Sequence, residues 1–299
     1  MGNTSNTISP LGIGTSQIAS LGRGINHSEA KRLFDTALDY QVTTIDTADT
    51  YGSGDSERMI GKAIQAKRSD FYVITKAGFP YVHLPGFLSP LNQIGKKVLQ
   101  STGGNKSYSK KYLIQSLEKS LKRLKTDYVD AFLLHEPLGV DLLAFDDFWE
   151  ALELIKKNGM ANNIGISTND SSAYMMASNR IKLDLVETGM PYGQDENSSV
   201  FSLAKNDHIP VVLNEVLKPY KSLLENAGVV ALLREYGKSD QELIGILLAH
   251  SIYEKKGQCA LTGTRNPNHL IQNVAAFREN ANILEVFQEI STYFKVHCI

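Results

Sequence analysis

The segment IDTADTYGSGDSERMIG, residues 45–61, begins with an apolar run and ends at the start of a helix. Asp46, Asp49 and Tyr51 lie in and around the turn between the two. In a barrel of parallel strands, polar residues at the carboxyl ends of strands are typical of an active site, because the barrel interior itself is packed. The segment therefore predicts a strand, a turn carrying chemistry and a helix.

The same alternation of strand and helix extends in both directions from this segment. Residues 26–40, for example, place apolar residues at helical spacing behind Asn26, an N-cap candidate with Glu29 three residues on. Strands are predicted at 10–15, 43–46, 71–76, 128–135, 162–167, 183–188, 209–214 and 258–263. Helices are predicted at 26–40, 55–67, 109–125, 143–158, 171–180, 196–206, 222–236, from 239 onward, at 267–278 and at 280–295.

Eight strands that alternate with helices predict a parallel sheet, either doubly wound or closed. The strand count favours closure. A dinucleotide-binding doubly wound sheet would also carry G-x-G-x-x-G after its first strand, and residues 12–17 lack the third glycine. We therefore expect an α/β fold, a closed (β/α)8 TIM barrel with extra C-terminal helices, formed by one domain over residues 1–299.

Composition favours a small-molecule partner. The chain has 299 residues, 42% of them apolar, and a formal net charge of −1, with no basic stripe for nucleic acid and no apolar run long enough to span a membrane. The polar N-terminus resembles no signal peptide, so a cytoplasmic protein is expected. Cys259 and Cys298 lack metal-ligand spacing and are expected to be reduced thiols.

Four polar side chains follow three successive predicted strands: Asp46, Tyr51, Lys76 and His135. An ammonium close to a tyrosine lowers the pKa of the phenol, and a carboxylate keeps a buried ammonium charged. The imidazole could orient a carbonyl oxygen toward the phenol. Each residue taken alone is compatible with a turn, rim packing, a snorkelling lysine or a core histidine, but the four together predict a catalytic group.

One connection, residues 77–108, is much longer than the others and is rich in Gly, Pro and aromatic residues. Loops of this length in a compact domain are usually functional or disordered, and we expect this one to cover the active site. The residues Phe79, Tyr81, His83, Leu84 and Phe87 indicate an aromatic, partly polar pocket. Shorter loops at 136–143 and 215–222 would complete it.

At these residues the chain resembles the aldo-keto reductase family. The resemblance runs through nearly the whole chain and is most specific in residues 45–61 and in SLKRLKTDYVDAFLLHEP, residues 120–137. It implies a barrel that transfers a hydride between a nicotinamide cofactor and a carbonyl or alcohol, with the family's catalytic tetrad at Asp46, Tyr51, Lys76 and His135. It also implies NADPH as the cofactor, with NADH possible, and a small carbonyl or sugar substrate.

The resemblance also implies which residues bind the cofactor. The residues that would bind the nicotinamide half of the cofactor are Gly14, Thr15, Ser16, Asp46, Ser167, Thr168, Glu187, Asn214 and Leu217. The adenosine-phosphate half falls on the last barrel strand and its helix, at Gly263, Thr264, Arg265, His269, Gln272 and Asn273. Arg265 and His269 are expected one helical turn apart, facing one phosphate at the helix N-terminus.

Several of these positions depart from the family pattern. Thr168 stands where Asn is usual, and Glu187 stands where a Gln binds the carboxamide. Asn214 occupies the place of an aromatic that stacks on the nicotinamide, so Tyr192 or Tyr220 could serve instead. His269 stands where an Arg is frequent.

Two alternatives from other classes stay open. Lys76 could form a Schiff base in a lyase if it were near-neutral and desolvated. The barrel could also hold its cofactor as a sensor or interaction scaffold with little turnover. The sequence leaves the substrate, the reaction direction and the oligomeric state undecided.

Overall fold

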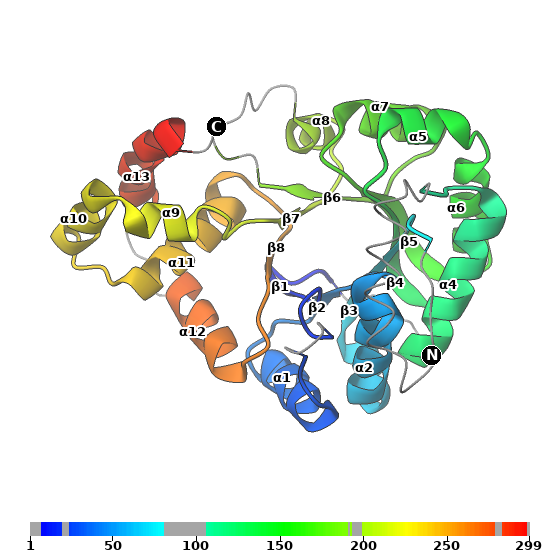
Figure 1. The fold of residues 1–299 in the computed structure, drawn as a ribbon, viewed down its shortest axis with the longest axis horizontal. Coiled ribbons are helices and arrows are strands. Elements are labelled where there is room, and N and C mark those ends of the chain that lie inside the picture. Colours follow the sequence, from blue (N-terminus) through cyan, green and yellow to red (C-terminus); the bar gives the residue numbers. More distant parts are fainter. Residues whose placement is uncertain are drawn as a thin grey trace.

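A computed structural model describes residues 7–19, 24–80, 106–190, 192, 199–278 and 283–297. Eight parallel strands close into a barrel in the order β1-β2-β3-β4-β5-β6-β7-β8, and the helices lie around it (Figure 1). The predicted α/β barrel is therefore confirmed. The strands are β1 Leu11–Gly14, β2 Thr44–Asp46, β3 Tyr72–Ala77, β4 Val129–His135, β5 Ala161–Ser167, β6 Leu185–Gly189, β7 Val211–Asn214 and β8 Cys259–Thr262.

The helices follow the strands as predicted, with extra helices in the last third of the chain. In order they are α1 His27–Asp39, η1 Tyr51–Gly54, α2 Asp55–Ile64, η2 Gln65–Asp70, α4 Lys110–Leu124, α5 Gly139–Ala144, α6 Phe148–Lys157, α7 Ser171–Arg180, α8 Val200–Asn206, α9 Tyr220–Glu225, α10 Ala227–Glu235, α11 Asp240–Ala249, η5 His250–Glu254, α12 Pro267–Arg278 and α13 Ile283–His297. Helix α13 lies beside α10 and α11, outside the ring of barrel helices (Figure 1).

Two predicted helices are each a pair of shorter helices. The segment predicted at 143–158 divides into α5 and α6, because Phe145 leaves helical geometry at φ −126° and ψ 74°. The segment predicted at 222–236 divides at Asn226, whose side chain accepts hydrogen bonds from the backbone N–H groups of Gly228 and Val229 and so begins a new helix. The helical spacing of apolar residues continues across both breaks, so the sequence predicted single helices. The helices end because the backbone at Phe145 and Asn226 is not helical.

Apolar side chains fill the inside of the barrel at the level where the strands begin. This inner core consists of Tyr72, Ile74, Ala131, Leu133, Leu185, Val212, Cys259 and Leu261, with Ile8 packed against it. A larger core lies between the sheet and the surrounding helices. The Cys259 thiol is free and buried, and burial raises its pKa, as expected for an inert structural cysteine.

Every second residue of a strand faces the barrel interior. Near the barrel mouth these inward-facing positions carry charged side chains. On β3 the series Tyr72, Ile74 and Lys76 faces one side, and on β6 Leu185 is followed by Glu187. On β4 the same alternation runs from Ala131 and Leu133 to His135. Because the carboxyl ends of all eight strands meet at one rim, these side chains converge.

No helix among the described residues is long and apolar enough to cross a membrane.

Candidate active site

The structure brings the four predicted catalytic residues together inside the barrel mouth. The ammonium of Lys76, fully buried, donates hydrogen bonds to Asp46 Oδ1 and, at 3.1 Å, to the backbone carbonyl of Thr47. Lys76 Nζ lies 5.4 Å from the centre of the Tyr51 ring. The Tyr51 and His135 rings meet edge to face with centroids 5.8 Å apart. An acid, a phenol, an ammonium and an imidazole thus share one small volume.

The turn that positions Tyr51 depends on its two glycines. Gly52 has φ 57° and Gly54 has φ 89°, conformations that glycine adopts without steric cost. A β-carbon on Gly52 would also lie 2.7 Å from that of Ala19, closer than side chains approach. The chain therefore turns sharply after Tyr51 and directs it back over the strand ends.

Helix α2, which follows this turn, is fixed to the barrel by a buried carboxylate. Glu57 is fully buried and accepts 2.6 Å hydrogen bonds from the Thr75 hydroxyl of β3 and from Arg123 Nε of α4. Thr75 directly precedes Lys76, so the contact ties the helix after Tyr51 to the strand that carries the lysine. Such paired buried charges are costly to break singly.

His135 is held by the two ends of the long loop after β3. The hydroxyl of Tyr108 donates a 2.8 Å hydrogen bond to the His135 carbonyl, and Phe79 packs edge to face on the His135 ring at 5.2 Å. Lys106 Nζ donates to the Glu136 carbonyl at 2.6 Å. The ends of the predicted loop 77–108 therefore reach the active site, although Ala77 itself belongs to β3. Tyr81, His83, Leu84 and Phe87 lie outside the described residues.

A second carboxylate, that of Glu187, contacts Lys76. The sequence had predicted Glu187 only as a cofactor-binding residue. Glu187 Oε2 lies 3.2 Å from Lys76 Nζ, and Glu187 Oε1 accepts a 3.0 Å hydrogen bond from the Asn214 amide. Asn214, expected at the place of a stacking aromatic, thus orients a carboxylate. The alternation of side chains along β6 could have indicated that Glu187 faces the barrel interior. It could not have indicated that Glu187 contacts Lys76 on β3.

These contacts fix the charge state of Lys76. Burial alone would lower the pKa of its ammonium, but Asp46 and Glu187 together outweigh burial and raise it. An amine that stays protonated is a poor nucleophile. The Schiff-base alternative, which needs a near-neutral Lys76, is therefore disfavoured by the two carboxylates.

The pKa of Tyr51 differs from the expected direction. Lys76 has the largest single influence and lowers it, as expected, but desolvation and the nearby carboxylates Asp46, Glu187 and Glu136 outweigh that influence. The net effect raises the pKa of Tyr51 above the ordinary value of a tyrosine. The expectation of a lowered pKa was wrong because it counted one carboxylate and no burial. The phenol remains protonated at neutral pH, as a proton donor must.

A hollow of about 500 Å³ opens beside this group over the ends of β5 and β7. Its lining includes three predicted cofactor residues, Ser167, Thr168 and Asn214. Ser167 pairs with both His135 and Glu187 in the register of β4, β5 and β6, which places it next to the tetrad. Leu217 lies half-buried in the turn after β7. Three predicted nicotinamide residues therefore line one hollow next to the tetrad.

The hydroxyls of two predicted cofactor residues already have protein partners. Thr15 donates to the Asp46 carbonyl at 2.8 Å and accepts from Ser56 at 2.9 Å. Thr168 donates to the Pro137 carbonyl at 2.8 Å. Both threonines therefore shape the rim, where Gly14, paired with Asp46 in the sheet, and the exposed Ser16 adjoin them.

The segment predicted to bind the adenosine phosphate lies at β8 and α12. Gly263, His269 and Gln272 are exposed, whereas Thr264 and Asn273 are buried, and the Thr264 hydroxyl accepts a hydrogen bond from Asn266 N–H. Helix α12 begins at Pro267, so Arg265 precedes the helix. Asn266 accepts the first helical hydrogen bond, from Leu270, so Arg265 and His269 lie on either side of the helix start, as the predicted helix at 267–278 implied. Their contact with one phosphate stays a prediction.

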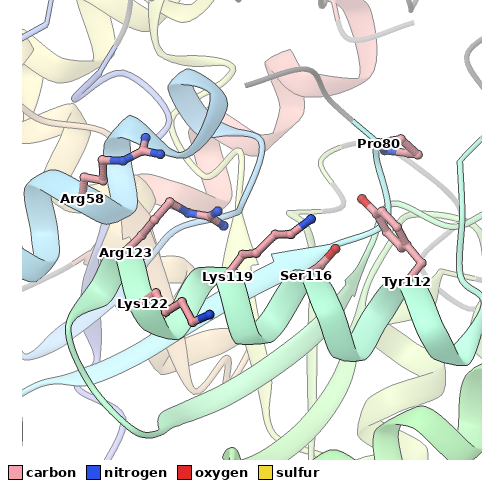
Figure 2. Close-up of a pocket in the computed structure, with 7 residues that line it drawn as sticks. All are labelled: Arg58, Pro80, Tyr112, Ser116, Lys119, Lys122 and Arg123. Atoms are coloured by element: carbon pink, nitrogen blue, oxygen red, sulfur yellow. The ribbon is translucent and has the colours of Figure 1, made fainter. Parts of the chain in front are cut away.

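Another hollow, of about 410 Å³, lies between α2 and α4, with Pro80 also in its lining (Figure 2). Four cationic side chains surround it, but two of them have carboxylate partners: Arg58 pairs with Asp55 at 2.8 Å, and Arg123 pairs with Glu57 at 2.6 Å. None of the tetrad residues lines it.

Comparison with known proteins agrees with this geometry. The profile of the Aldo/keto reductase family matches residues 10–290. D-threo-aldose 1-dehydrogenase of Pseudomonas sp is 31% identical over 249 residues, which are 79% of this chain and 74% of that protein. The uncharacterized oxidoreductase YqkF of Bacillus subtilis is 31% identical over 186 residues, 61% of this chain and about half (53%) of that protein.

A solved structure has the same fold. The aldo/keto reductase from Klebsiella pneumoniae, in complex with NADP and acetate, superposes with a TM-score of 0.73 at 19% identity, covering 96% of this chain and 92% of that chain. The chain belongs to the aldo/keto reductase family, as its sequence predicted, and so to a family of NADPH-using oxidoreductases.

Proposed function

We propose that this chain reduces the carbonyl group of a small aldehyde, ketone or sugar, or oxidises the corresponding alcohol, with Tyr51 as general acid and base. The observation that carries the proposal is the buried Lys76, held by two carboxylates with its ammonium 5.4 Å from the Tyr51 ring. A phenol that stays protonated at neutral pH, beside a permanent cation, suits proton donation to a carbonyl oxygen.

The roles of the other residues follow from their positions. NADPH, when bound, supplies the hydride for the carbonyl carbon. Tyr51 gives its proton to the carbonyl oxygen, Lys76 stabilises the resulting phenolate, and His135, whose ring contacts that of Tyr51, orients the oxygen. Ser167, Asn214 and Glu187 would hold the nicotinamide carboxamide at the hollow, and residues 263–273 would hold the adenosine phosphate.

The substrate class is drawn from the same site. D-threo-aldose 1-dehydrogenase, by its name, acts on an aldose, and its similarity to this chain favours a sugar lactol or aldehyde. Phe79 offers an aromatic face beside His135, as a sugar ring or an aryl ketone would require.

Turnover with a panel of aldoses, aldehydes and ketones tests the proposal. We expect NADPH oxidation with at least one carbonyl, or NADP⁺ reduction with its alcohol, and a loss of kcat of about 10²-fold or more in Tyr51→Phe, with cofactor affinity nearly constant. Cofactor binding without turnover across the panel would favour the sensor alternative. A fully active Tyr51→Phe would remove Tyr51 as the acid.

A further inference from the structure

Three charged side chains meet on the inner face of the barrel: Asp46 of β2, Lys76 of β3 and Glu187 of β6. Their side chains are 4%, 0% and 3% exposed, and both carboxylates contact the same ammonium. If all three were ionised, one negative charge would remain without compensation. An uncompensated buried charge costs far more than the uptake of one proton.

The other groups around this cluster do not supply the missing positive charge. On β7 the neutral Asn214 amide donates to Glu187, and directly after β2 the Thr47 carbonyl accepts from Lys76. Tyr51 of η1 and Cys259 of β8 are weak acids, both with raised pKa. The neighbour on β4 is His135, whose ring meets the Tyr51 ring edge to face, and Glu136, directly after β4, is a further carboxylate. Strand β5 contributes Ser167.

The surrounding charges also change the pKa of Asp46. Burial raises the pKa of Asp46, the negative charge of Glu187 raises it further, and the opposing influence of Lys76 does not offset the two. A side-chain hydrogen bond with Glu187 acts in the same direction. Both carboxylates contact the same ammonium, so one proton held between them would cancel the excess negative charge.

We propose that Glu187 is a positioning residue that holds one proton jointly with Asp46, so that Lys76 faces a single negative charge at neutral pH. The consequence for catalysis rests on the proposed function. Proton donation leaves a phenolate on Tyr51, which Lys76 stabilises and each additional carboxylate destabilises. The shared proton therefore keeps the charge beside the phenolate neutral, and its loss at alkaline pH opposes reduction.

Infrared spectroscopy of the cofactor-free protein tests the shared proton without any activity. At pH 7 the wild type should show the carbonyl stretch of a buried protonated carboxyl group, which Glu187→Gln and Asp46→Asn should each lose. Glu187→Gln retains an oxygen that can accept from Asn214, so the fold is expected to persist. Asp130→Asn is the matched control, since that carboxylate is 4% exposed and pairs with Arg68 at 2.7 Å.

The pH profile then tests the catalytic consequence. The kcat of reduction by the wild type should fall at alkaline pH, as the pair loses its proton. Glu187→Gln should not show this fall in kcat, and its KM for the carbonyl substrate should change little. A wild type without the band at pH 7, or a Glu187→Gln that keeps it, would overturn the shared proton. A protein that shows the band but turns over no carbonyl would instead count against the proposed function.

Discussion

The hydroxyl of Tyr108 donates a 2.8 Å hydrogen bond to the backbone carbonyl of His135. Tyr108 is fully buried and lies at the end of the long loop after β3, 27 residues before His135 in the sequence but in contact with it in space. The contact fixes the strand end that carries the imidazole.

Tyr108→Phe should therefore lower the free energy of unfolding by about 0.5–1.5 kcal/mol, because a buried carbonyl loses its donor. The kcat should also fall, since His135 loses a constraint. Urea denaturation of the variant measures the first effect. Tyr253→Phe, at an exposed residue, is the control and should stay within about 0.5 kcal/mol. A Tyr108→Phe protein as stable as the wild type would show that the hydrogen bond contributes nothing net.

Lys76→Met should abolish activity and make stability depend on pH. Without the ammonium, Asp46 remains buried beside the carboxylate of Glu187 with a raised pKa, so the folded state keeps a proton that the unfolded state releases. The stability from such groups is present at low pH and lost as pH rises, so the variant should lose more stability at pH 8 than at pH 5.5.

Thermal or urea unfolding at the two pH values measures this difference, and breaking the pair should cost about 3–5 kcal/mol at the higher pH. Lys31→Met removes an exposed ion pair with Asp35 and should cost at most about 1 kcal/mol at either pH. Equal losses for Lys76→Met at both pH values would contradict the charge balance described for the barrel mouth.

Tyr51 should titrate above the ordinary pKa of tyrosine, about 10, because burial and three carboxylates outweigh Lys76. The ultraviolet difference between wild type and Tyr51→Phe, followed through alkaline pH, isolates this phenol. The phenolate signal should be nearly absent at pH 10. A signal already complete at pH 9 would mean that the ammonium dominates.

Arg265→Ala should weaken NADPH binding about ten- to a hundred-fold, which corresponds to about 1.5–3 kcal/mol for one charge-assisted phosphate contact. NADH binding should stay nearly constant, because NADH lacks the 2′-phosphate. His269→Ala is the companion variant, at an exposed residue of α12. Fluorescence titration gives both dissociation constants. Equal losses for the two cofactors would place the 2′-phosphate elsewhere.

The sequence by itself determined the barrel and predicted which four polar residues meet at its mouth. Eight apolar segments separated by amphipathic helices allow few topologies, and polar residues at the ends of parallel strands must meet at one rim. Asp46, Lys76 and His135 could therefore be brought together from strand order alone. The sequence also located the long loop, although residues 81–105 lie outside the described part of the chain.

Only the tertiary structure decided which groups touch and how their charges balance. Strand order places Glu187 and Lys76 on strands three apart in the sequence, and closure of the barrel brings them to 3.2 Å across its interior. It also showed that the pKa of Tyr51 rises. Periodicity along a chain reports which face a side chain occupies, whereas pKa values and ion pairs depend on distances and burial, which arise when distant strands close around one volume.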